Sequence, residues 1–183
     1  MPSNKKQTPA ADLSLLLKEL KKAEVDFILV GGVAAVAQGA PIMTFDLDIV
    51  HCRSNENIIK IEKFLKSVNA FQRRPDEKVI EPDMNALRGK GHMLLSTCFG
   101  PLDILAVIEK GLGYDELLKN TVEIEFQNFK IHVLSLETII DLKKKSKRPD
   151  DQYRLQILEE TLRQAPGTDN IGVMKDNSQI GQR

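Results

Sequence analysis

Apolar residues recur at helical spacing in four stretches of the chain. The first two cover residues 12–24 and 55–68. Two more cover residues 136–145 and 150–163, and Pro149 separates them because proline disfavours a helical conformation in the residue before it. The pattern predicts four amphipathic helices, two of them towards the end of the chain.

Shorter apolar segments are typical of strands. Residues 27–30 form a continuous run of the kind found in a strand covered on both faces, and residues 44–50 alternate between polar and apolar. Between them, Gly31-Gly32 interrupts the pattern and residues 33–38 predict a short apolar helix. This part of the chain is therefore expected to run strand, turn, helix, strand.

Two hairpins are expected further along the chain. One pairs residues 93–99 with 102–108 around Gly100-Pro101, and the other pairs 122–126 with 129–134 around Gln127-Asn128. A polar loop, residues 72–90, is predicted before the first hairpin, and a short helix, residues 115–118, between the two.

The order of elements indicates a single domain of the α/β (α+β) class, a mixed β-sheet flanked by helices with further helices at the C-terminal end. This domain is expected to cover residues 12–164. Residues 1–11 and 165–183 are polar and lack sustained periodicity, so we expect a disordered N-terminus and a flexible C-terminal tail.

Net charge, cysteine spacing and the length of the apolar runs indicate in which compartment the protein works. Lys and Arg together number 26, as do Asp and Glu, so net charge predicts no general attraction to nucleic acid or membranes. Cys52 and Cys98 match no metal or redox spacing, and no apolar run resembles a signal peptide or a membrane span. These features favour a soluble protein of the cytoplasm.

Candidate chemistry begins in the alternating segment. If residues 44–50 form a strand, Asp46 and Asp48 point the same way, about 7 Å apart along the strand, while Phe45 packs into the interior. Two carboxylates on one face repel each other, and a hard cation such as Mg²⁺ would relieve that repulsion. The alternative is an exposed edge strand with two solvated aspartates.

Two further features bear on that alternative. Gly31-Gly32, between a strand and a helix, would make a backbone nest suited to phosphate, although an ordinary turn has the same sequence. Asp103 is a single acid within an apolar strand, and it would lie alongside the other two aspartates if the strands are neighbours. Otherwise Asp103 caps the turn after Gly100-Pro101.

Together these motifs resemble the nucleotidyltransferase (polymerase-beta-like) superfamily. Its signature is an apolar strand, Gly-Gly or Gly-Ser, a short helix, Asp-apolar-Asp and a later acid, here Gly31-Gly32, Asp46-Leu47-Asp48 and Asp103. Two features are more specific to a minimal bacterial branch: Thr44, two residues before the first Asp, and Leu142-Lys143, which is separated by four residues from Arg-Pro-Asp-Asp at 148–151. That branch is related to the nucleotidyltransferase components of toxin–antitoxin and abortive-infection systems.

The resemblance implies transfer of a nucleoside monophosphate from an NTP with Mg²⁺, or Mn²⁺, as cofactor. Asp46 and Asp48 would bridge two ions about 3.5–4 Å apart, and Asp103 would hold the second ion and accept a proton. Gly31, Gly32, Thr44 and Lys143 would bind the nucleotide. The acceptor, which could be RNA such as tRNA, a protein or a small molecule, is not readable from the sequence.

Some positions depart from the family pattern. Ile42 stands where the family often has arginine, which favours an alternative in which the fold is kept and transfer is lost, leaving a nucleotide-binding or toxin–antitoxin-type interaction module. Asp150 and Arg154 exchange the family's charges across one helical turn, so we expect a structural ion pair.

Lys143 could also be part of a solvated helix face, as expected for the neighbouring basic residues up to Arg148. His51, on the face opposite the aspartates, is interpreted as packing or surface.

Overall fold

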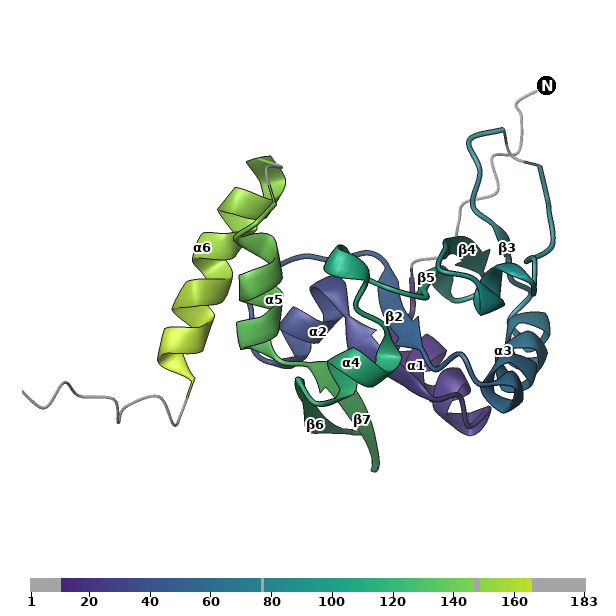
Figure 1. Ribbon diagram of the computed structural model, residues 1–183, viewed down its shortest axis with the longest axis horizontal. Coiled ribbons are helices and arrows are strands. Elements are labelled where there is room, and N and C mark those ends of the chain that lie inside the picture. The colour runs from purple at the N-terminus through teal and green to yellow at the C-terminus, as the bar shows by residue number, and fades with distance from the viewer. Residues whose placement is uncertain (1–10, 77, 147–148, 166–183) are drawn as a thin grey trace, which may run out of the picture.

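The computed structural model describes residues 11–76, 78–146 and 149–165, with the backbone alone for Pro149 and Asp150 (Figure 1). The predicted disordered N-terminus and flexible tail lie outside these residues, apart from Ala11 and Ala165. Seven strands form one sheet in the order β3-β4-β5-β2-β1-β7-β6. Their bounds are β1 (Phe27–Val30), β2 (Leu47–His51), β3 (Phe71–Gln72), β4 (His92–Thr97), β5 (Gly100–Leu105), β6 (Thr121–Phe126) and β7 (Phe129–Leu134).

The helices fall close to the predicted segments. They are α1 (Leu13–Lys22), α2 (Gly31–Ala37), α3 (Asn55–Ser67), α4 (Tyr114–Leu118), α5 (Leu136–Lys143) and α6 (Pro149–Gln164), with 3-10 turns η1 (Ala86–Arg88) and η2 (Glu109–Gly111). Helices α5 and α6 lie at one end of the molecule, and α3 lies with β3 and β4 at the other (Figure 1). Within the described residues, no helix is long and apolar enough to cross a membrane.

The sheet is mixed, as predicted. Strand β1 pairs antiparallel with β2 and parallel with β7, and all four of its residues are buried. Strand β2 pairs parallel with β5, and this pairing joins the first half of the chain to the first hairpin. The acidic segment therefore lies in the middle of the sheet rather than at its edge.

The start of β2 differs from the prediction. The strand begins at Leu47, so residues 44–46 approach it outside the ladder of hydrogen bonds. Phe45 was expected to pack inside, but it is 69% exposed, because strand alternation does not extend to a residue that no neighbouring strand pairs with.

The turn of the first hairpin also differs. Residues 98–99 make the turn, while Gly100 and Pro101 already belong to β5. The Thr97 hydroxyl closes this turn: it donates to the carbonyl oxygen of Gly100 at 2.7 Å and accepts from the Phe99 amide at 3.1 Å. The second hairpin turns at Gln127-Asn128 as predicted, with positive φ at both residues.

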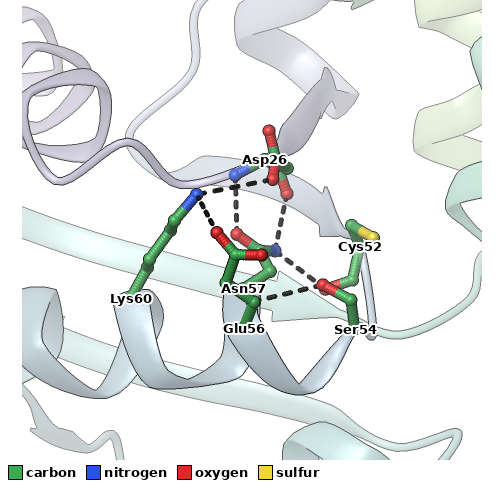
Figure 2. A network of polar contacts seen from close by, with 6 residues as sticks. All are labelled: Asp26, Cys52, Ser54, Glu56, Asn57 and Lys60. Carbon is green, nitrogen blue, oxygen red and sulfur yellow. Dashed lines mark hydrogen bonds and ion pairs between the residues drawn. The ribbon is translucent and has the colours of Figure 1, made fainter.

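Buried polar groups fasten α3 to the sheet (Figure 2). Asn57 is fully buried, and its side-chain oxygen accepts from the Asp26 amide at 2.7 Å. Its side-chain nitrogen donates to the carbonyl oxygens of Asp26 and Cys52 at 2.9 and 2.8 Å. Ser54 caps the helix by accepting from the Asn57 amide at 3.2 Å. The network ties the start of β1 and the end of β2 to one helix.

His51 is a packing residue, one of the two roles expected for it. It is fully buried, and its ring nitrogens lie 3.0 Å from the carbonyl oxygen of Leu105 and 2.9 Å from that of Leu87. The predicted loop 72–90 therefore includes a turn, η1, that is anchored to the sheet through Leu87, which is itself buried.

Candidate active site

Three carboxylates converge in the middle of the sheet. One oxygen from each of Asp46, Asp48 and Asp103 lies within 4.8 Å of the others. The cause is strand register, because β2 and β5 run parallel with Asp48 directly beside Asp103. Asp46, two residues earlier in the chain, reaches the same side. The predicted convergence is confirmed, and Asp103, within its strand and only 8% exposed, does not cap a turn.

The two glycines that begin α2 make room for this cluster. Gly31 has φ of +66°, and a Cβ atom at that position would overlap the carboxylate of Asp48. A Cβ atom at Gly32 would collide with the side chain of Thr44. The Thr44 hydroxyl in turn donates to an Asp46 carboxylate oxygen at 3.2 Å. Both glycines therefore allow α2 to lie against the acidic residues, and their contact with phosphate stays a prediction.

Burial and mutual repulsion change the protonation of the cluster. Burial, followed by the charges of Asp46 and Asp103, raises the pKa of Asp48 to about 7. Burial also raises the pKa of Asp103 above its usual range, although the charge of Arg73 opposes this. A site that holds its carboxylates at this cost in free energy favours a bound cation.

Arg73 is a site residue that the sequence analysis missed. Its Nη2 donates to both carboxylate oxygens of Asp103, at 2.6 and 3.0 Å. Its backbone amide donates to the carbonyl oxygen of Leu94, the residue of β4 paired with Asp103. Arg74, the next residue, pairs with Asp76 instead. No local signal distinguishes the two arginines, because strand pairing alone decides which of them reaches Asp103.

Lys143 lies on the other side of the cluster. It ends α5 and lines a cavity of about 280 Å³ together with Gly31 and Asp48. Its Nζ lies 2.7 Å from a carboxylate oxygen of Asp151. Lys144 is more exposed and pairs with Glu159. As predicted, the side chains of Lys143 and Lys144 therefore point in different directions, that of Lys143 towards the cavity.

The ion pair between Lys143 and Asp151 was not predicted. The pair that was expected joins Asp150 to Arg154, and the Asp150 side chain lies outside the described residues, as do Lys147 and Arg148. Asp151 also accepts from the Ser146 hydroxyl at 2.6 Å, so the start of α6 is fastened to the end of α5 next to the candidate site.

Two solved structures share the fold of this chain. The lincosamide antibiotic adenylyltransferase LnuA, lincomycin-bound, matches with a TM-score of 0.54 and 16% sequence identity, over 81% of this chain and 95% of its own. ANT(2")-Ia, in complex with adenylyl-2"-tobramycin, matches with a TM-score of 0.52 and 13% identity, over 80% of this chain and 85% of its own. No protein-family model and no curated protein matches the sequence. The chain thus has the nucleotidyltransferase fold that its motifs predict.

Proposed function

We propose that this protein is a Mg²⁺-dependent nucleotidyltransferase that moves a nucleoside monophosphate from an NTP to a hydroxyl-bearing acceptor. The observation that carries the proposal is the register of Asp48 and Asp103, which completes a three-carboxylate cluster within a nucleotidyltransferase fold. Hard oxygen ligands at this spacing suit Mg²⁺, which completes its shell with water and substrate phosphates. Mn²⁺ is expected to substitute.

In the proposed reaction, the acceptor oxygen bonds to the α-phosphorus while the bond from that phosphorus to the β-phosphate's bridging oxygen breaks. Pyrophosphate leaves with the bond electrons, and the hydroxyl proton passes to Asp103, whose raised pKa makes it a stronger base than an exposed aspartate. Asp46 and Asp48 would hold a divalent ion, which when bound would neutralise charge on the phosphates.

The nucleotide is proposed to lie between α2 and the end of α5. Gly31 and Gly32 offer backbone amides there, and Thr44 places a hydroxyl beside Asp46. Lys143 faces the same cavity and would contact a phosphate by exchanging part of its pairing with Asp151. This side of the cluster is cationic through Lys143, as a triphosphate requires.

For the acceptor we propose only a class of molecule. LnuA is an antibiotic adenylyltransferase and the ANT(2")-Ia complex holds an adenylylated tobramycin, which supports nucleotidyl transfer to a small molecule on this fold. RNA such as tRNA, or a protein, remains a candidate acceptor, the latter in keeping with a toxin–antitoxin-type role. We place the reaction in the cytoplasm, where NTPs and Mg²⁺ are available.

The direct test is transfer of label from NTPs. The purified protein is incubated with each α-³²P-labelled NTP and Mg²⁺, in turn with total RNA, cell lysate and a small-molecule extract. We expect a labelled product and pyrophosphate with one NTP, abolished by EDTA and by Asp48→Asn. Label recovered in none of the three fractions, although the NTP binds with Mg²⁺, would contradict transfer.

A second candidate is a nucleotide-binding module without transfer. Ile42, at the position where the resembled family often has arginine, packs partly buried against the core and offers no charge to a phosphate. This module would bind Mg²⁺ and NTP and release no pyrophosphate, so pyrophosphate release separates the two candidates.

A further inference from the structure

The charges around the acidic cluster are unevenly distributed. Asp103 has a guanidinium cation in contact with both of its carboxylate oxygens. Among the described residues, neither Asp46 nor Asp48 has an ion pair, and Asp46 has only the Thr44 hydroxyl as its side-chain partner. Within the cluster, a cation is therefore in direct contact with Asp103 alone, while Lys143 on the other side pairs with Asp151 instead.

The backbone holds Arg73 in this position. Its amide donates at 2.8 Å to Leu94, and Leu94 stands opposite Asp103 in the β4–β5 ladder. Strand β4 therefore separates the backbone of Arg73 from that of Asp103. The side chain of Asp103, with which Arg73 pairs, is only 11% exposed. A divalent ion bound to Asp103 would lie within a few ångströms of the guanidinium and would be repelled by it.

We propose that Arg73 takes the place of a second metal ion, so that the protein binds one divalent cation, held by Asp46 and Asp48. One guanidinium and one divalent ion together balance the three carboxylate charges. Asp103, which needs no metal, is then free to accept the acceptor's proton, and Arg73 is a positioning residue that orients its carboxylate. The inference rests on the proposed function, and it replaces the two ions that the family resemblance implies with one.

The test counts bound ions. Free Mn²⁺ is measured by electron paramagnetic resonance at pH 8, with and without saturating α,β-methylene analogues of the four NTPs. Wild-type protein should bind one ion per chain, both alone and in the nucleotide complex. Arg73→Ala should gain a second ion or bind Mn²⁺ at least tenfold more tightly. Arg73→Lys should restore a single ion. Arg74→Ala, which removes the neighbouring arginine, should leave the count and the affinity unchanged.

A second variant keeps the test decisive if Arg73→Ala fails to fold, as judged by circular dichroism. Asp103→Asn should still bind one Mn²⁺ with a Kd within threefold of wild type, because Asp103 is not a ligand of that ion. A tenfold loss in Asp103→Asn, or two ions in the wild-type complex, would overturn the inference and leave the proposed function standing. Absence of any Mn²⁺ binding to wild type would overturn both.

Discussion

Two polar clusters lie inside this protein, and they differ in how completely they are satisfied. Around Asn57, each side-chain group has a partner of the opposite hydrogen-bonding type, and the cluster joins α3 to β1 and β2 (Figure 2). Around Asp48, three carboxylates share one guanidinium, and the pKa of Asp48 is raised to about 7.

The contrast shows how a structural cluster differs from a functional one. Buried hydrogen bonds that are all made stabilise the folded state. Buried like charges destabilise it and favour any ligand that brings the opposite charge. Removing the first cluster should therefore lower stability and spare binding, whereas neutralising the second should raise stability and remove binding.

The largest effect is expected from Asp46→Asn/Asp48→Asn. Because the double variant lacks the charges proposed to hold the metal, calorimetry should show Mg²⁺-dependent NTP binding weakened by about 4 kcal/mol, a factor of roughly 1,000. Its thermal midpoint should rise by about 3–6 °C as repulsion disappears. Glu123→Gln/Glu125→Gln, an equal charge change on β6, is the control. Undiminished NTP binding in the aspartate variant would contradict a metal-bridged site.

Stability should depend on pH through Asp48. Its folded-state pKa is raised, so the folded protein binds more protons than the unfolded chain between pH 4 and about 7. The free energy of unfolding, measured by urea titration without metal, should fall by about 2–4 kcal/mol as pH rises through that window, relative to Asp48→Asn. Above about pH 7, the free energy of unfolding should change little. A wild-type profile parallel to that of Asp48→Asn would show that Asp48 does not titrate there.

Asn57→Ala should reverse the pattern of the aspartate variant. It removes the hydrogen bonds to the amide of Asp26 and to the carbonyl oxygens of Asp26 and Cys52, of which only the Asp26 oxygen keeps a second donor, the Cys52 amide, so urea unfolding should show a loss of about 2–4 kcal/mol. Nucleotide affinity should stay within twofold at a temperature where the variant is folded. Asn55→Ala, at an exposed position of the same helix, should cost less than about 0.5 kcal/mol. Equal losses in the two variants would refute a structural role for the network.

The smallest expected effect is a difference in NTP binding between variants of two lysines, Lys143 and Lys145. Lys143→Ala should weaken NTP binding by about 1.5–3 kcal/mol, as expected for a hydrogen bond to a charged group. Lys145→Ala, at an exposed position, should change it by less than about 0.5 kcal/mol. Because Lys143 also pairs with Asp151, Asp151→Asn serves as a further control: it neutralises that ion pair and keeps the Lys143 side chain. Small, equal effects of both lysine variants would mean that this helix end is a solvated surface.

Local sequence pattern predicted the parts of the site that depend on strand periodicity. Asp46 and Asp48 could be placed on one side because side chains alternate in strands. Asp103 could be placed beside them, on the condition that their strands are neighbours, because an acid within an apolar strand is rarely unpaired. Phe45 was misplaced because the point where β2 joins the sheet depends on its neighbours and not on its own alternation. Arg73 could not be found at all, because it lies in a segment predicted as a polar loop, and only its hydrogen bond to β4 brings it to Asp103.

Gly31 has a practical consequence for anyone designing an inactive form of this protein. The Asp48 carboxylate lies in the space that a side chain at residue 31 would need, and the backbone there has a positive φ. A single methyl group at this position, as in Gly31→Ala, would push the proposed metal ligand aside without adding or removing an ionisable group. Such a variant would serve as a blank for cellular experiments in which the composition of charged residues has to stay the same.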